Sequence, residues 1–225
     1  MKLQFKNIAI IGLGLIGSSI LHALNVKFDK NFKIFAYDKN PNYRKIVKKM
    51  NIADVVCGKI NQAVENADLI ILAVPVGSMG NVAQKIKPFL KKGAIITDTG
   101  STKISVIKDV KPFIPKEVSF IPSHPLAGTE HSGPEAGFAS LFENRYWIIV
   151  SKKEDENTIK LHNLFKKFGA IVEYMDAEYH DKILAITSHL PHLIAYTIVG
   201  TANDLEQDLK NDVIRFSATG FRDFT

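Results

Sequence analysis

The sequence contains very little cysteine. Cys57 is the single cysteine among 225 residues, so no disulfide can form within the chain. This excludes the small secreted proteins that depend on disulfides and favours a reducing compartment, for which we expect the cytoplasm. Hydrophobic residues make up 46% of the chain and charged residues 23%, a balance that suits a globular protein with an apolar core.

Long hydrophobic runs and clusters of like charge are also scarce. No uninterrupted apolar run reaches the roughly 18 residues that a bilayer requires, so we expect no membrane segment. The N-terminal segment MKLQFKNIAIIGLGLIG is interrupted by glycines and predicts a first strand rather than a signal peptide. The net charge of +6 is dispersed, whereas nucleic-acid binding needs a basic face, so we expect no nucleic-acid partner.

Segments typical of strands and helices alternate through residues 1–175. The strand-like segments are almost continuously apolar, which indicates a parallel sheet with helices on both faces. The predicted fold class is therefore α/β, with a doubly wound, mostly parallel sheet. The predicted strands span 6–12, 32–38, 67–75, 93–101, 118–124, 145–151 and 170–175. The predicted helices span 15–26, 41–50, 78–91, 102–111 and 154–169.

The character of the sequence changes at about Ala177. Beyond it the pattern predicts a long helix and a second helical piece, with no further strand. We therefore expect one domain over residues 1–175 and the beginning of an all-helical domain over residues 176–225.

A glycine-rich turn, GLGLIG, follows the first predicted strand and opens the first predicted helix. Gly12 permits a tight turn, Gly14 lets the backbone approach a pyrophosphate, and Gly17 lets the helix pack closely on the strand. An acid, Asp38, ends the next strand about 20 residues further on, as the dinucleotide-binding fingerprint requires. This context favours a Rossmann-like dinucleotide-binding domain over a glycine turn that binds nothing.

The identity of the cofactor depends on Asp38. Its carboxylate can accept hydrogen bonds from ribose hydroxyls and would repel a 2′-phosphate, so we expect NAD, with NADP less favoured. Lys39 beside it weakens that preference. The loops that follow later strands should line the same cleft. The predicted cofactor-binding residues are Gly12, Gly14, Leu15, Ile16, Gly17, Asp38, Val74, Pro75, Thr99 and Gly100.

A histidine, His124, ends the predicted strand over residues 118–124. A dehydrogenase that oxidises an alcohol carbon needs a group that accepts the hydroxyl proton, and the ordinary pKa of histidine suits that role. Pro125 restricts His124 to an extended backbone. Ser101 should lie near the nicotinamide end of the cofactor, where it could hydrogen-bond the same substrate oxygen or orient the imidazole. We predict that His124 and Ser101 are catalytic.

A second cluster of polar residues lies in the segment TSHLPHLIAY. Ser188 and His192 are four residues apart and would share one face of a helix, as would His189 and His192. Pro191 is expected to bend this helix, because it cannot donate a backbone hydrogen bond. The histidines could instead bind a metal, but we find no third ligand at suitable spacing and predict no metal site.

The motifs together resemble one family. GLGLIGSS, LAVPV, TDTGSTK, SHPLAGTEHSG, TSHLPH and GFRDFT occur in this order. In this respect the chain resembles the prephenate dehydrogenase family, which includes arogenate and cyclohexadienyl dehydrogenases, over essentially its whole length. The pairing of HPLAGTE with the later SHLPH is the most specific part of the resemblance.

The resemblance implies NAD(P)-dependent oxidative decarboxylation of prephenate to 4-hydroxyphenylpyruvate in tyrosine synthesis, by a homodimer. His124 and Ser101 match the residues that contact the ring hydroxyl of the substrate. The substrate-binding residues that the resemblance implies are Glu130, Ser188, His189 and His192. Arogenate dehydrogenase, and a non-catalytic NAD-binding fragment, are the alternatives.

One departure from the family pattern concerns the end of the sequence. In the family, GFRDFT is followed by an arginine that binds a substrate carboxylate, whereas this sequence ends at Thr225. A guanidinium group is the natural bidentate partner of a carboxylate, so we expect weak substrate binding by this chain alone. Arg222 or Arg145 could substitute, although neither matches the pattern.

Overall fold

The computed structural model describes residues 4–151 and 155–203 of the chain. The chain divides into two compact units, Met1–Ala177 and Glu178–Thr225.

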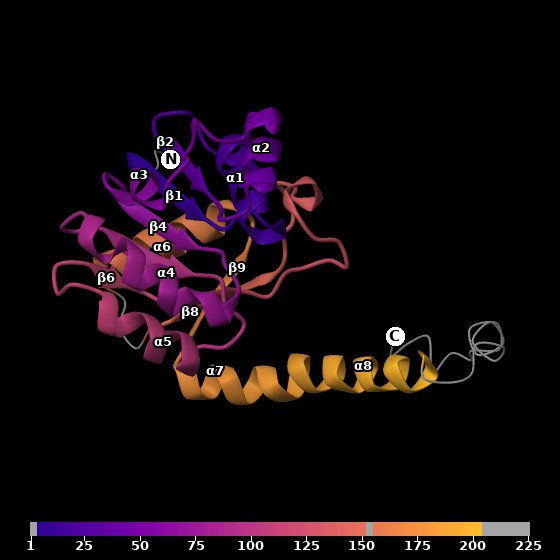
Figure 1. Ribbon diagram of the computed structural model, residues 1–225. Helices are drawn as coiled ribbons and strands as arrows, with labels where there is room; N and C mark the ends of the chain where they lie inside the picture. The colour runs from indigo at the N-terminus through magenta and orange to yellow at the C-terminus, as the bar shows by residue number, and fades with distance from the viewer. Residues whose placement is uncertain (1–3, 152–154, 204–225) are drawn as a thin grey trace. The chain divides into compact units, whose positions relative to one another are not determined.

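The first unit is built on a six-stranded parallel sheet (Figure 1). The strand order is β3-β2-β1-β4-β5-β6, so the winding reverses between β1 and β4. In sheets of this kind the crevice at the reversal, beyond the carboxyl ends of the strands, is where ligands bind. The predicted Rossmann-like fold is confirmed. The strands are β1 (Asn7–Ile11), β2 (Lys33–Tyr37), β3 (Val55–Val56), β4 (Leu69–Leu72), β5 (Ile95–Asp98) and β6 (Ser119–Phe120).

Two apolar cores lie on the two faces of this sheet. Alternate residues of a strand point to opposite faces, and β1 shows this directly. Ile8 and Ile10 belong to the core that includes side chains of α1 and α6, whereas Ala9 and Ile11 belong to the core that includes side chains of α3 and α4. The helices are α1 (Leu15–Lys27), α2 (Pro41–Met50), α3 (Ile60–Val64), α4 (Met79–Ile86), α5 (Ile104–Val110) and α6 (Glu156–Lys167).

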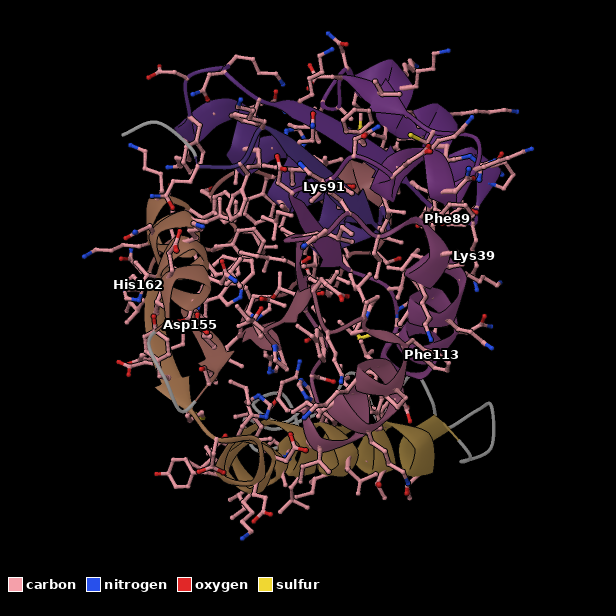
Figure 2. All side chains as sticks on the ribbon, turned by 90° about the vertical axis from the view of Figure 1, so that its left-hand side faces the viewer. Lys39, Phe89, Lys91, Phe113, Asp155 and His162 are labelled. Atoms are coloured by element: carbon pink, nitrogen blue, oxygen red, sulfur yellow. The ribbon has the colours of Figure 1, made fainter. Side chains whose placement is uncertain are left out.

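A second, three-stranded sheet adjoins the first along the chain. Strand β7 (Ser123–Pro125) runs antiparallel to β8 (Tyr146–Val150), which runs parallel to β9 (Ile171–Met175). Helix α6 connects β8 to β9. Asp155, labelled in Figure 2, is its N-cap residue, and Oδ1 of Asp155 accepts from the N–H groups of Asn157 and Thr158.

The predicted single strand over residues 118–124 is wrong. The segment forms β6 in one sheet and β7 in the other. The change takes place at Ile121 and Pro122: the N–H of Ile121 donates to Ile96 at 2.9 Å, whereas the carbonyl of Pro122 accepts from Val150 at 2.8 Å. Pro122 has no N–H to continue the first ladder, so the chain leaves it there. As a result His124 lies inside β7, and not at the end of a long parallel strand.

The described part of the second unit is one continuous helical segment. It comprises the end of α7 (Ala177–Leu184), a π-helical turn η5 (Ala185–His189) and α8 (Leu190–Asn203). Pro191 was expected to bend this helix, and the structure instead widens the turn before it into the π form. Widening of this kind is one way in which a helix accommodates a disturbed hydrogen-bond ladder.

This helical segment also bears on the expectation that the chain has no membrane segment. The stretch Ala177–Thr201 is 25 residues long, with a mean hydropathy of 1.4 over a membrane-length window. Within the described residues it is thus long and apolar enough to cross a membrane, by length and composition alone. Core helices of soluble proteins pass the same test. A few polar residues interrupt its apolar ones, so the stretch contains no unbroken apolar run of membrane length.

One ion pair ties the amino ends of the strands together. Asp68, just before β4, accepts hydrogen bonds from the N–H groups of Lys6 and Asn7, each at 2.9 Å. Its other oxygen lies 2.5 Å from the ammonium of Lys91, a residue labelled in Figure 2. Burial alone would raise the pKa of Asp68, but these hydrogen bonds and the charge of Lys91 outweigh burial and lower it below the ordinary value of 3.8.

We expect Asp68→Asn to reduce the free energy of unfolding at neutral pH by about 1 kcal/mol, because the pair is partly exposed to water. A lowered folded-state pKa gives stabilisation that is present above the unfolded-state pKa and is lost as the pH falls through the folded-state value. The difference between variant and wild type, measured by urea unfolding, should therefore narrow as the pH falls below 3.8. A difference independent of pH would contradict this assignment.

Candidate active site

A cavity of about 680 Å³ opens at the carboxyl ends of the strands, where the winding reverses. It lies within the first unit, and its walls come from the segments after β1, β2, β4 and β5 and from β7. Every predicted cofactor-binding residue except Gly17 lines it, and so do both predicted catalytic residues. The predicted residues in the wall are Gly12, Gly14, Leu15, Ile16, Asp38, Val74, Pro75, Thr99, Gly100, Ser101 and His124.

Two of the three glycines in the turn are required by backbone packing. Gly12 has φ +102°, and a Cβ there would lie 2.4 Å from the carbonyl oxygen of Ala73. A Cβ on Gly17 would lie 1.9 Å from the carbonyl oxygen of Gly12. The turn, the start of α1 and the loop after β4 therefore pack backbone against backbone, and Gly17 does this without reaching the cavity.

Gly14 has a different role. It is the N-cap residue of α1 and lines the cavity, and a Cβ built on it would meet nothing within 4 Å. No side chain caps the helix here. The first N–H groups of a helix have no partner within it and carry a positive partial charge, which favours a phosphate group. The space at Gly14 and the uncapped α1 together fit the pyrophosphate of a dinucleotide.

Asp38 lines the cavity directly after β2. Its Oδ2 accepts from the N–H of Leu13 at 2.7 Å, and its Oδ1 accepts from the N–H of Asn40 at 2.7 Å. Each carboxylate oxygen can accept a further hydrogen bond, so a pair of ribose hydroxyls can still be bound. Arg44 donates to the backbone carbonyls of Asp38 and Lys39, at 2.5 and 3.2 Å.

His124 and Ser101 lie in the wall of the same cavity. His124 is paired with Ile148 in the β7–β8 ladder, and only 9% of its surface is exposed. The ladder fixes its backbone, as does Pro125 after it. Ser101 lies in the turn between β5 and α5 and is exposed to solvent. A buried histidine and an exposed serine thus face the space in which a dinucleotide fits.

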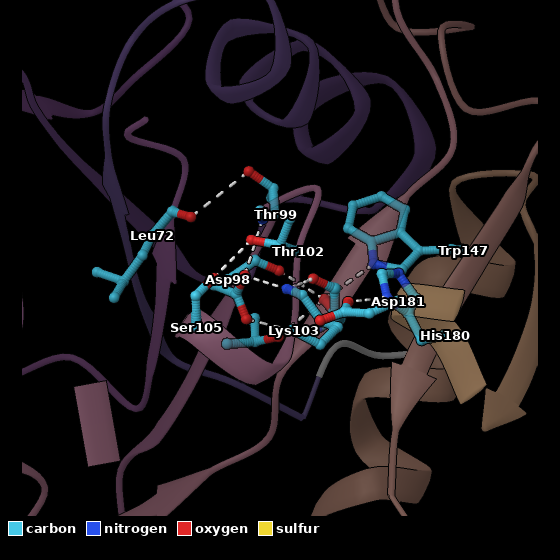
Figure 3. A network of polar contacts seen from close by, with 12 residues as sticks. Leu72, Asp98, Thr99, Thr102, Lys103, Ser105, Trp147, His180 and Asp181 are labelled. Carbon is cyan, nitrogen blue, oxygen red and sulfur yellow. Dashed lines mark hydrogen bonds and ion pairs between the residues drawn. The ribbon is translucent and has the colours of Figure 1, made fainter. Parts of the chain in front are cut away.

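A buried polar network that was not predicted from the sequence adjoins these two residues along the chain (Figure 3). Its centre is an ion pair between Asp98 and Lys103, whose side chains are both 0% exposed. Ser123 and Trp147 also belong to the network. Burial raises the pKa of Asp98, and the ammonium of Lys103 and two backbone N–H groups oppose that rise. The sequence feature that could have indicated this ion pair is the five-residue spacing of acid and lysine in DTGSTK, at the end of a strand.

The other predicted substrate residues are not in the cavity wall. Glu130 is exposed, and its Oε1 lies 3.2 Å from Nε2 of His131, which is also exposed. Ser188, His189 and His192 belong to the second unit, in η5 and α8. Arg145 is exposed and does not line the cavity.

Two further expectations concern the end of the chain and metals. Arg222 and the segment GFRDFT lie outside the described residues. In the described part of the chain, no group of three or more His, Cys, Asp or Glu side chains is arranged to hold a metal ion.

The fold and the cavity define a class of protein: one with a Rossmann-like domain whose crevice fits a dinucleotide. Comparison with known proteins makes this narrower. Residues 23–174 match the nucleotide-binding domain of prephenate dehydrogenase, and residues 176–225 match the dimerization domain of prephenate dehydrogenase. The chain belongs to the prephenate dehydrogenase family.

Individual relatives agree with this assignment. The chain is 43% identical to the cyclohexadienyl dehydrogenase of Zymomonas mobilis, over 98% of this chain and 75% of that protein. It is 38% identical to the prephenate dehydrogenase of Lactococcus lactis, over 98% of this chain and 60% of that protein. The crystal structure of the A. aeolicus prephenate dehydrogenase in complex with hydroxyphenyl propionate and NAD+ is similar at a TM-score of 0.87, with 30% identity, over 100% of this chain and 78% of that one.

The glycine turn provides a test of the cofactor site. Gly14→Ala should leave the melting temperature close to that of the wild type, because the new methyl group meets no protein atom. It should lower the affinity for NAD by about tenfold or more, because the methyl group would stand where a pyrophosphate approaches. Calorimetric titration with NAD measures this.

Gly17→Ala is the matched control. The Cβ of this alanine would collide with backbone, so the variant should have a lower melting temperature as well as a lower affinity for NAD. Unchanged NAD affinity in Gly14→Ala would place the pyrophosphate elsewhere.

Proposed function

We propose that the protein catalyses the NAD-dependent oxidative decarboxylation of prephenate to 4-hydroxyphenylpyruvate, a step of tyrosine biosynthesis in the cytoplasm. The observation that carries this proposal is the shared cavity: His124 and Ser101 line the same space as Gly14 and Asp38. The candidate proton acceptor and the residues expected to bind a dinucleotide thus adjoin each other in a chain of the prephenate dehydrogenase family.

In the proposed reaction, His124 accepts the proton of the ring hydroxyl. Ser101 donates a hydrogen bond to the same oxygen and fixes its position. NAD, when bound, supplies the oxidant that takes the hydride from the carbinol carbon. The ring then loses its carboxylate as CO2, and the electron pair of that bond moves through the ring to the oxygen, which takes the proton back from His124. The product is an aromatic phenol, and aromatisation supplies the driving force. The protein therefore contributes mainly orientation and proton acceptance.

The rest of the substrate site is proposed to come from outside the cavity wall. We assign substrate binding to Glu130, Ser188, His189 and His192, and we assign residues 176–225 to a helical domain for substrate binding and dimerisation. The match to a dimerization domain supports this assignment. In α8, exposed apolar side chains such as Leu193 and Tyr196 would be covered in a homodimer.

The preference for NAD over NADP is proposed to rest on Asp38. The wild type should bind NAD more tightly than NADP, because the carboxylate accepts ribose hydroxyls and repels a 2′-phosphate. Asp38→Ala should lower the ratio of the two affinities by about tenfold or more, through loss of a hydrogen bond to a charged group. Asp54→Ala, which removes an acid that lines no part of the cavity, is the control. Equal affinities in the wild type would contradict the assignment.

The role of His124 can be tested by His124→Asn. This variant should retain its affinity for NAD and lose turnover by about 100-fold or more, since general-base catalysis contributes that much. Absorbance at the wavelength of reduced nicotinamide follows the reaction in the full-length protein. His162→Asn, which changes a histidine outside the cavity, should not alter turnover. Full turnover in His124→Asn would show that another group accepts the proton.

Arogenate is the second candidate substrate. It differs from prephenate in carrying an amine on the side chain, and the ring chemistry is the same. A relative supports it by name: a probable arogenate/prephenate dehydrogenase of Methanocaldococcus jannaschii, 28% identical over 93% of this chain. Rates with the two substrates, measured side by side, decide between them. Turnover of neither would favour a non-catalytic NAD-binding protein.

A further inference from the structure

We propose that the buried pair Asp98–Lys103 is a positioning device that holds Ser101 and His124 at a fixed separation around the substrate hydroxyl. This inference rests on the proposed roles of Ser101 and His124. Asp98 and Lys103 do not line the cavity, so they would act through these two residues and not on the substrate.

The carboxylate of Asp98 binds the backbone on both sides of the site. Its Oδ2 accepts from the N–H of Gly100 at 2.8 Å, and Gly100 directly precedes Ser101. Its Oδ1 accepts from the N–H of Ser123 at 3.2 Å, and Ser123 directly precedes His124. One rigid side chain at the end of β5 thus fixes two separate segments of the cavity wall.

Lys103 completes the bridge. Its ammonium group is in contact with Oδ2 of Asp98 and lies 2.6 Å from the carbonyl oxygen of Ser123. The turn that carries Ser101 begins at Asp98 and ends at Lys103, and both of its ends are therefore bonded to β7. These contacts leave the turn little freedom to move relative to His124.

The hydroxyl of Ser123 makes further hydrogen bonds that hold β7 in place. It donates to the carbonyl of Asp98 at 2.7 Å and accepts from Nε1 of Trp147 at 3.0 Å. It also lies 2.9 Å from the hydroxyl of Thr97. The indole of Trp147 is stacked on Phe165, with ring centroids 3.9 Å apart, so this donor is itself held in the core.

Stability alone does not account for such a pair. Replacing a buried ion pair by apolar residues is often neutral or stabilising, because the charges lose their hydration. The pair instead affects geometry, since a misplacement of about 1 Å at a reacting centre can reduce the rate by about 100-fold.

The chain contains a comparable acid–lysine pair, Asp68–Lys91, for use as a control. It lies at the opposite, amino end of the strands and also binds two backbone N–H groups.

The test measures recognition of a phenolic hydroxyl in the full-length protein with NAD present. The two probes are 3-(4-hydroxyphenyl)propionate and 3-phenylpropionate, which differ only in that hydroxyl, and calorimetry gives both dissociation constants. The wild type should bind the hydroxylated probe about tenfold more tightly, the effect of about one net hydrogen bond. The double variant Asp98→Asn/Lys103→Met should bind the two probes about equally and keep its affinity for 3-phenylpropionate.

The matched control is Asp68→Asn/Lys91→Met, which should retain the wild-type ratio. It removes a similar pair, although a more exposed one, from the other end of the sheet. If the Asp98/Lys103 double variant does not fold, Ser123→Ala replaces it, because it removes only one hydroxyl. In Ser123→Ala the preference for the hydroxylated probe, expressed as the ratio of the two affinities, should fall by about threefold or more, since a single weakened hydrogen bond changes affinity by that much.

The outcomes separate this proposal from the proposed function. A wild type that does not distinguish the probes contradicts the roles of Ser101 and His124, and the positioning role with them. A wild type that distinguishes them, together with a folded Asp98/Lys103 variant that distinguishes them equally well, contradicts only the positioning role. An equal loss in the Asp68/Lys91 control would also overturn it, because the effect would then be general loosening of the sheet.

Discussion

The site depends on the contact of backbone with backbone where the first turn meets the loop after β4. Gly12 and Gly17 have no room for a Cβ, so α1 begins directly against the sheet. This close approach points the uncapped end of α1 into the crevice at which the winding of the sheet reverses. The proposed dinucleotide site is therefore a consequence of strand order and of three glycines, and the side chains around it are proposed to add selectivity to a site that the backbone has already formed.

The proposed catalytic side of the cavity is built in a different way, by a change of sheet. Because the chain leaves the parallel ladder at Pro122 and joins β8, His124 is presented from a short antiparallel strand with its backbone paired on one side. Asp98 then joins this strand to the turn that carries Ser101. In the proposed function, the parallel sheet supplies the cofactor crevice, and the second sheet supplies the proton acceptor. The buried pair Asp98–Lys103 is the link between the two.

Much of this arrangement could be predicted from the sequence, for physical reasons. Long apolar strands and glycine turns leave strong local patterns, so β1, β4 and the GLGLIG turn were identified, and the residues after parallel strands were expected at one edge. Elements as short as β3 (Val55–Val56) carry no periodicity and were not predicted. The division of residues 118–124 depends on which partner each half finds, which is a tertiary property. The pairing of Lys103 with Asp98 could not be predicted either. A charged residue in a turn usually faces water, and only the tertiary structure shows that this lysine is buried.

The central claim is that an imidazole and a dinucleotide meet across one cavity. The most direct measurement is a crystal structure of the full-length protein with NAD and a 4-hydroxyphenyl ligand. We predict the pyrophosphate at the start of α1 and a nitrogen of His124 within about 3.2 Å of the ligand hydroxyl. A ring of His124 turned away from the ligand, or a cofactor bound outside the crevice, would contradict the account.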